Sequence, residues 1–276
     1  MGTDNPTYGT IDRDYEAKLR STSPEDDGPI YMVNLMRYHE RAQYADGRET
    51  DLSGKEADDL YAPLGPLAKV GAEVAFFGEV LIQAFNEDPK WDRVGVIRYP
   101  SRQAFVDMQS DPQFQDLHEH KEAGMAETYV IGCLPMEIPS LPEGIPPLDQ
   151  VSHPSTAEDG QVTVVHVIKF KDPDQLGDME TYQNVAGRIG MGVGVRVGSW
   201  MNVEGTIVGD GERWDQVRFN IFPSLAGLLE LAEDPERLKV QEDNRKAAIE
   251  TTYTFVIRPL VNRIPEMVGA GYSHLA

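Results

Sequence analysis

Hydrophobic residues occur in short runs separated by polar stretches, and the same succession of runs occurs twice along the chain. In the first half, runs rich in β-branched and aromatic residues predict strands over 30–38, 73–82, 91–99 and 129–134. Helical spacing predicts helices over 53–69 and 101–128, the first of them kinked or divided by Pro63 and Pro66. The order β-α-β-β-α-β is that of a ferredoxin-like unit.

The second half has the same order, with strands predicted over 162–170, 194–203, 214–222 and 254–258 and helices over 179–189, 225–232 and 236–252. Trp91 begins the third strand of the first half, and Trp214 begins the corresponding strand 123 residues later. The closing prolines, Pro135 and Pro259, are 124 residues apart, which places one inserted residue in the last helix. The near-constant spacing indicates an internal duplication.

The repeat predicts one unit over 29–135 and another over 161–260, joined by a proline-rich linker at 136–160. An extension at 1–28 precedes them and a tail at 261–276 follows. A ferredoxin-like unit covers only one face of its sheet with helices, so the other face needs a partner. We therefore expect an α+β fold in which two tandem units form a fused barrel, an internal pseudo-dimer. Whether it pairs again as a homodimer stays open.

The composition is globular and acidic, with 25 basic and 46 acidic residues and a net charge of −21. Such a surface repels phosphate groups, so neither nucleic acid nor a membrane is an expected partner. No apolar run is long enough to span a bilayer, and the N-terminal residues lack a signal-peptide pattern. The single cysteine, Cys133, excludes an internal disulfide and fits a cytoplasmic protein.

Several segments of the first half together resemble one family: Tyr31 to Tyr38, Ser53 to Ala57, Trp91 to Ser101, Ser110 to Pro112, and His120-Lys121. They resemble an uncharacterised bacterial domain family of the dimeric α+β barrel superfamily. The resemblance covers 29–135 well, and 161–260 looks like a divergent copy. It implies the fold but no single activity. The superfamily includes cofactor-independent monooxygenases, polyketide cyclases, muconolactone isomerases and fused haem enzymes such as chlorite dismutases.

Polar side chains on otherwise hydrophobic strands are the first candidates for chemistry, because a buried polar group must be hydrogen-bonded or it destabilises the fold. Asn34 shares a strand face with Met32 and Met36, and His166 is its counterpart in the second half. Asn34 would polarise a substrate carbonyl, and His166 would act as a general acid or base. The alternative is that both side chains bond to backbone at an irregularity of the sheet.

The predicted last helix of the first unit supplies further candidates. His118 lies on its apolar face, and Glu242 and Arg245 occupy the positions that match His118 and Lys121 in the second half. The remaining candidates are His120 as an acid or base, and Arg37, Lys121, Tyr38, Trp91 and Trp214 as substrate-binding residues. Each has a structural alternative: a solvated or capping histidine, a cation at the rim of the barrel, or a core aromatic ring.

We expect neither a metal nor another cofactor. His118 and His120 are two residues apart, so on a helix they point in different directions and cannot chelate one metal. Fused haem members of the superfamily take an axial histidine, commonly from the second unit's helices. The predicted helices there contain none.

The candidates predict a cofactor-independent enzyme that acts by proton transfer on a small oxygenated or aromatic metabolite, as a cyclase, isomerase, lyase or monooxygenase. A histidine, either His166 or one of His118 and His120, would take a proton α to a carbonyl, while Asn34 and a cation stabilise the enolate. The alternatives are a non-catalytic small-molecule-binding or stress protein that uses the same pocket, and a pure oligomerisation module.

Overall fold

The protein, described by a computed structural model over residues 5–138 and 140–269, divides into two compact units. Unit 1 consists of Met1–Gly78, Pro89–Leu134 and Val203–Arg213, and unit 2 of Glu79–Asp88, Pro135–Asn202 and Trp214–Ala276. Two long strands, β3 (Glu73–Ala84) and β7 (Arg196–Gly209), contribute to both. Each unit therefore includes the end of a strand that begins in the other.

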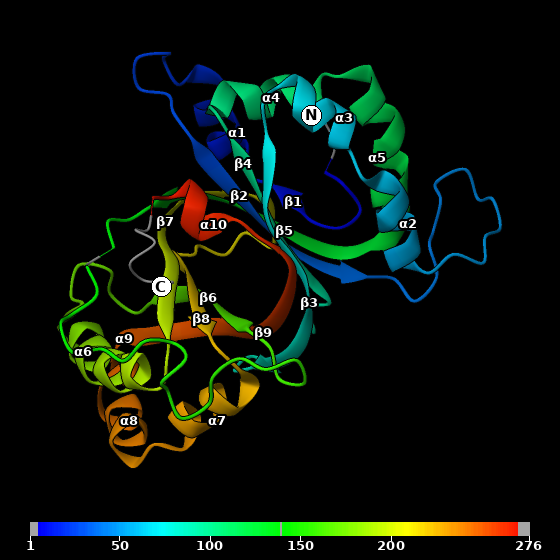
Figure 1. Ribbon diagram of the computed structural model, residues 1–276. Coiled ribbons are helices and arrows are strands. Elements are labelled where there is room, and N and C mark those ends of the chain that lie inside the picture. Colours follow the sequence, from blue (N-terminus) through cyan, green and yellow to red (C-terminus); the bar gives the residue numbers. More distant parts are fainter. Residues whose placement is uncertain (1–4, 139, 270–276) are drawn as a thin grey trace. The chain divides into compact units, whose positions relative to one another are not determined.

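Unit 1 places its helices on one side of a sheet with the strand order β5-β2-β4-β3 (Figure 1). Its elements are β1 (Thr10–Ile11), α1 (Arg13–Ser21), β2 (Ile30–Tyr38), α2 (Gly54–Tyr61), α3 (Leu64–Lys69), β4 (Arg93–Tyr99), α4 (Arg102–Gln109), α5 (Pro112–Gly124) and β5 (Met125–Pro135). β2 pairs antiparallel with β4 and β5, so Asn34 lies between Gly95 and Val130.

Unit 2 has the matching strand order β9-β6-β8-β7. Its elements are β6 (Val162–Phe170), α6 (Gly177–Gly192), β8 (Gln216–Phe222), α7 (Leu225–Glu233), α8 (Pro235–Val240), the π-helix η1 (Gln241–Arg245), α9 (Lys246–Ala248), β9 (Ile249–Asn262) and α10 (Ile264–Met267). Because β3 and β7 run through both sheets, the strand order closes into an eight-stranded barrel. The predicted α+β fold of two ferredoxin-like units is confirmed.

The helices differ from the prediction where prolines or the inserted residue intervene. The helix predicted over 53–69 divides into α2 and α3 at Pro63, and a capping box between Ser53 and Glu56 begins α2. The continuous helix predicted over 236–252 is wrong, because that segment forms α8, η1 and α9 before β9 starts at Ile249. The backbone N–H of Lys246 donates to Gln241 O, five residues earlier. A π-turn of this kind accommodates one extra residue inside a helix.

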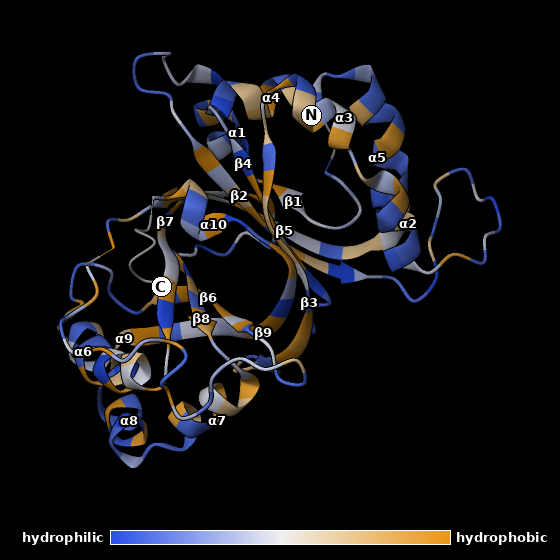
Figure 2. Ribbon diagram, in the orientation of Figure 1, coloured by the Kyte–Doolittle hydropathy of each residue, from blue (hydrophilic) through white to orange (hydrophobic). Residues whose placement is uncertain are grey.

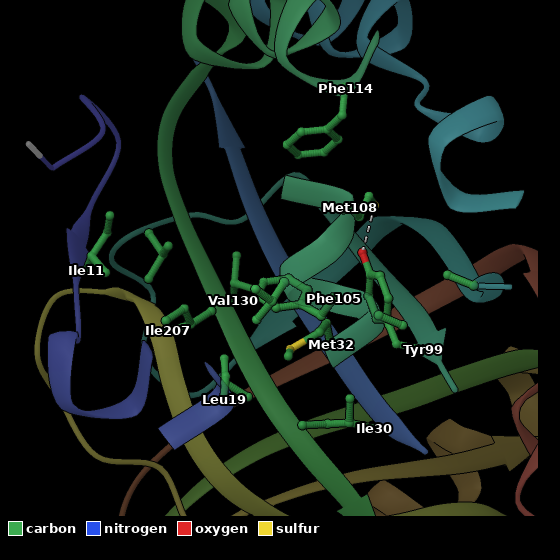
Figure 3. Packing of buried hydrophobic residues seen from close by; sticks show 14 of the residues in the cluster. Ile11, Leu19, Ile30, Met32, Tyr99, Phe105, Met108, Phe114, Val130 and Ile207 are labelled. Carbon is green, nitrogen blue, oxygen red and sulfur yellow. Dashed lines mark hydrogen bonds between the residues drawn. The ribbon is translucent and has the colours of Figure 1, made fainter. Parts of the chain in front are cut away.

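The N-terminal extension is a structural part of unit 1. Tyr8, Ile11, Tyr15 and Leu19 are buried in the core between the helices and the sheet, where Figure 3 shows Ile11 and Leu19 beside residues of β2 and β5. The Tyr15 hydroxyl also donates to Glu204 Oε2 at 3.0 Å. The extension therefore does more than the polar sequence suggested. In the predicted tail, α10 buries Ile264, and residues 270–276 lie outside the described part of the chain.

Hydrophobic residues follow the strands of unit 2, whereas α8 is mostly hydrophilic (Figure 2). Val165, Val167, Phe219 and Phe255 on these strands are almost completely buried. Over residues 5–138 and 140–269, no helix has the length and hydrophobicity needed to cross a membrane.

Candidate functional site

The helix-facing side of the unit 2 sheet carries a polar interruption of the hydrophobic core. β6 presents Val164, His166 and Ile168 on this side, because alternate residues of a strand share a face. Val164 packs in a cluster with residues of α7, and Ile168 belongs to a separate cluster with residues of α6 and α9. His166 lies between them on the strand and is only partly buried. Unit 1 encloses one continuous core in the same place.

His166 is held by a neighbouring strand. Its Nδ1 atom lies 3.0 Å from Thr254 Oγ1, and the strand register places Arg218 on its other side. Burial, with additional repulsion from Arg245, Arg218 and Arg237, lowers the pKa of His166 to about 3. At neutral pH the imidazole is therefore uncharged, with one ring nitrogen bound to Thr254.

Arg218 supplies a cation beside this imidazole, held by neutral groups. Its side chain is 5% exposed, and its Nε atom donates to Gln216 Oε1 at 2.9 Å. One Nη atom donates to Gln183 Oε1, and the guanidinium lies 4.5 Å from the ring centre of Trp200. Burial lowers the pKa of Arg218 to about 10, so the group remains charged at neutral pH. It can stabilise a negative charge that develops on a ligand in this place.

Unit 1 carries no such charge at the equivalent positions, where Asn34, Gly95 and Val130 replace His166, Arg218 and Thr254. The Asn34 amide donates to Met32 O at 3.0 Å. This hydrogen bond to the backbone is the structural alternative that the sequence allowed for Asn34. An added Cβ on Gly95 would lie 3.3 Å from Met36 Cε. Side chains of the core therefore fill the place that Arg218 occupies in unit 2.

The polar groups of unit 1 gather instead between α2, α5 and the sheet. The Tyr38 hydroxyl donates to Asp58 Oδ2 at 2.6 Å, and Arg93 Nη1 lies 3.2 Å from the same oxygen. Asp58 is 8% exposed. Burial raises the pKa of its carboxyl group, while Tyr38, Lys121 and Arg93 oppose this change. The charges of this cluster are paired, and the cluster can relay or hold a proton. The Asp58 carboxyl group, its principal acid, is already bound by Tyr38 and Arg93.

His118 and Lys121 lie next to this cluster on α5. His118 Nε2 is 3.1 Å from the Tyr8 hydroxyl, and its Nδ1 atom is buried without a hydrogen-bond partner among the described residues. Burial, followed by the charge of Lys121, lowers the pKa of His118 to about 4. Lys121 Nζ lies 5.7 and 5.4 Å from the ring centres of Tyr8 and Tyr61, and burial lowers its pKa. Three predicted site residues, Tyr38, His118 and Lys121, are thus brought into one region.

His120 and Arg37 lie elsewhere in unit 1. His120 Nδ1 is 2.7 Å from the hydroxyl of Tyr44, which does not belong to the Asp58 cluster. Arg37 pairs with Glu127 at 3.1 Å and leaves 41% of its side chain exposed. Both contacts match the structural alternatives for these residues.

The two tryptophans are core residues. Trp91 is 3% exposed and its ring centre lies 4.8 Å from that of Tyr129. Trp214 is 4% exposed and its ring centre lies 5.3 Å from that of Tyr253.

The inward position predicted for Glu242 is wrong, because its side chain is 65% exposed and pairs with Lys246. The π-turn changes the direction in which the side chains of this helix point, and Glu242 therefore faces solvent.

Sequence reasoning missed Tyr8, Asp58, Arg93, Thr254 and Arg218. A comparison of the two copies at the offset of 123 would have found Arg218, because it stands where the first copy has Gly95. No sequence pattern singles out Tyr8 or Asp58, since their contacts depend on helices and an N-terminal segment that meet only in three dimensions.

The residues present do not favour a metal or a haem. No group of three or more metal-ligating side chains occurs within residues 5–138 and 140–269. The helices that the structure describes in unit 2 contain no histidine, and the imidazole of His166 lies between Arg218 and Thr254, with Nδ1 engaged by Thr254. That set lacks a helix-borne axial ligand, so no haem chemistry is derived for this chain.

Neither a protein-family model nor a curated protein matches the chain. Among solved structures, the chain is similar to the RPA0582 protein of Rhodopseudomonas palustris, a protein of unknown function, with 34% identity over 47% of this chain and 96% of that one and a TM-score of 0.41. A mutant chlorite dismutase from Candidatus Nitrospira defluvii is 10% identical over 92% of this chain and 97% of that one, with a TM-score of 0.49.

A further similar structure is a dabb family protein with a ferredoxin-like fold from Mesorhizobium loti. It is 14% identical over 37% of this chain and 98% of that one, with a TM-score of 0.30.

Proposed function

We propose that the chain is an enzyme that acts by proton transfer on a small oxygenated or aromatic metabolite in unit 2, with His166 as the general base. The observation that supports this most is the interrupted core: a partly accessible, uncharged imidazole stands between two hydrophobic clusters. A buried polar group that only stabilised the fold would not require such a break. Small-molecule sites combine hydrophobic side chains with a few convergent polar groups, and this part of unit 2 supplies both kinds of residue.

The proposed step uses His166 and Arg218. With Nδ1–H donating to Thr254 Oγ1, the Nε2 lone pair is free to accept a proton from the carbon α to a carbonyl. The C–H electron pair then forms the carbon–carbon double bond of an enolate, and the negative charge on the oxygen is stabilised by the Arg218 guanidinium. When the substrate is a β,γ-unsaturated carbonyl compound, the enolate is a dienolate, and return of the proton from Nε2 to the γ-carbon completes an isomerisation. Asn34 belongs to unit 1 and has no part in this step.

A second candidate is a non-catalytic small-molecule-binding protein that uses the same place. The observation that favours it is the low basicity of His166, because an imidazole with a pKa of about 3 is a weak base at neutral pH. A ligand whose negative charge offset Arg218 and Arg245 would raise that pKa, so the two candidates differ in what happens after binding.

Hydrogen–deuterium exchange tests the proposal with phenylpyruvate as the probe, because its benzylic protons are acidic. We expect wild-type protein to accelerate exchange in D2O and His166→Gln to lose at least about tenfold of that acceleration. His153→Gln is the matched control, because His153 is exposed and pairs with Glu230 at 3.5 Å. Binding without exchange in the wild type would favour the binding protein. Equal exchange by His166→Gln and wild type would overturn the assignment of the base.

A further inference from the structure

Arg245, at the end of the π-helix η1, is a buried cation without a counterion. It is 5% exposed, and the described residues offer it neither an ion pair nor a hydrogen bond; its Nη2 atom is fully enclosed. Its guanidinium instead lies 4.7 Å from the ring centre of Phe85 and 5.9 Å from that of Tyr182. A buried charge that lacks a partner destabilises a protein, because the charge has lost its hydration without gaining an ion pair. Its position therefore calls for a reason beyond folding.

Arg218 repeats this arrangement. It is equally buried, and within residues 5–138 and 140–269 it bonds to amide oxygens of Gln216 and Gln183 and to no acidic side chain. The contrast with unit 1 is informative, since its buried arginines, Arg93 and Arg102, pair with Asp58 and Glu204. Arg196, the third buried arginine of unit 2, is held by backbone carbonyl oxygens. Among the described residues, the charges of Arg218 and Arg245 are therefore left free to pair with a ligand.

The backbone also departs from regular geometry where it places this site. The extra residue of the second copy forms the π-turn that ends at Arg245, and π-turns often occur at functional sites. Phe85, whose ring covers Arg245, has a φ of 58°, followed by a φ of 50° at Asn86. This left-handed region is strained for a bulky residue, and strain of this kind often occurs at functional sites. The π-turn positions Arg245, and the left-handed backbone at Phe85 positions the ring that lies over the Arg245 guanidinium.

The two guanidiniums contact neighbouring residues of α6, because Arg245 lies 5.9 Å from the ring centre of Tyr182 and Arg218 donates to Gln183 Oε1. Both charges also act on His166. We propose that Arg218 and Arg245 form a carboxylate-binding subsite of unit 2, covered by Phe85, so that the substrate of the enzyme carries a carboxylate. Guanidinium N–H pairs match the geometry of a planar carboxylate, and aromatic walls suit an organic acid. Naming the substrate rests on the proposed function, whereas the anion site itself does not.

Equilibrium binding of benzoate to the full chain, measured by isothermal titration calorimetry, tests this subsite. We expect saturable binding that weakens at least about tenfold in Arg245→Gln and Arg218→Gln. It should stay unchanged in Arg188→Gln, whose exposed side chain pairs with Glu236 on the surface. Benzyl alcohol, which lacks the charge, should bind at least about tenfold more weakly than benzoate.

Three results would overturn the subsite: no saturable binding of benzoate, equal binding by both arginine variants and the wild type, or tighter binding of inorganic phosphate. Should an arginine variant fail to fold, Phe85→Ala gives the same test, because loss of the cover should weaken benzoate binding. His166→Gln separates this proposal from the function above. Benzoate binding that persists in this variant while proton exchange is lost supports both, and loss of benzoate binding only in the arginine variants supports the subsite by itself.

Discussion

The Nδ1 atom of His166 on β6 lies 3.0 Å from Oγ1 of Thr254 on β9, so a hydrogen bond between adjacent strands orients the imidazole of unit 2. The equivalent pair in unit 1 is Asn34 and Val130, which cannot form this bond. Of these two equivalent pairs, the one in unit 2 therefore carries both the titratable group and the hydroxyl that holds it.

Removal of this hydroxyl should change the tautomer of His166. In Thr254→Val the Nδ1–H form loses its acceptor, so we expect the population to move toward the Nε2–H form. The ring 15N chemical shifts of His166 measure that population directly, and Thr254→Ser should restore the wild-type values. Identical shifts in the wild type and Thr254→Val would show that the hydroxyl does not select the tautomer.

His166 and His118, whose pKa values are lowered in the folded protein, should make the protein less stable as the pH falls. The pKa of His166 and that of His118 in the folded state, about 3 and about 4, lie below the unfolded value near 6.5. Below the unfolded pKa, only the unfolded chain takes up these protons. Each histidine therefore lowers the free energy of unfolding by about 1.4 kcal/mol per pH unit below that value, until its folded pKa is reached.

Urea unfolding of wild type, His166→Gln and His118→Gln between pH 7 and pH 5 measures this effect. Each variant should show a smaller loss of stability on acidification than the wild type, because one of the two groups no longer titrates. Parallel curves for all three proteins would mean that neither histidine is held neutral by the fold.

Glu204 should be one of the strongest single contributors to the stability of unit 1. It and Arg102 each leave only 8% of the side chain exposed, and Glu204 also accepts from Tyr15 of the N-terminal extension. Glu204→Gln leaves Arg102 partly unpaired and should lower the free energy of unfolding by about 3 kcal/mol. Glu236→Gln removes an exposed partner of Arg188 and should change it by less than about 1 kcal/mol. Chemical denaturation compares the two, and similar losses would contradict this role of burial.

The crossing of α2 and α5 requires glycine at position 124. A Cβ on Gly124 would lie 2.4 Å from the backbone oxygen of Gly54, and backbone cannot move aside as a side chain can. Gly124→Ala should therefore lower the free energy of unfolding by about 3 kcal/mol. Gly187→Ala in α6 meets its nearest atom at 3.8 Å and should raise it by about 0.7 kcal/mol through helix propensity. Thermal unfolding distinguishes these opposite signs, and a neutral Gly124→Ala would contradict the close contact.

Cys133 should report global unfolding. It is 0% exposed, and burial raises the pKa of its thiol, so little thiolate is available to react. A thiol reagent should label it only at the rate at which unit 1 opens, whereas Ser155→Cys adds an exposed thiol that reacts at once. Rapid labelling of Cys133 in the native protein would show that β5 opens locally.

Most of the fold could be predicted from the sequence, and much less of the site. Strand periodicity and the repeated tryptophan strands located the elements, because local hydrophobic patterns and turn residues act over neighbouring positions. The spacing correctly placed Lys121 on the inward face of its helix, whereas Glu242 was misplaced because a π-turn altered the helix register. Within its own half of the sequence, no local pattern distinguishes Arg218 from the other polar residues of the predicted strands.

The sequence by itself determined the β-α-β-β-α-β order of each half and the near-constant spacing between the halves, since both are encoded along one chain. Only the tertiary structure decided that the N-terminal extension enters the core of unit 1, and that Arg218 lies beside His166 with an amide rather than an acidic partner among the described residues. The physical reason is that burial and charge pairing depend on which distant segments pack together, and these contacts, rather than local spacing, decide whether a polar residue is structural or free to bind.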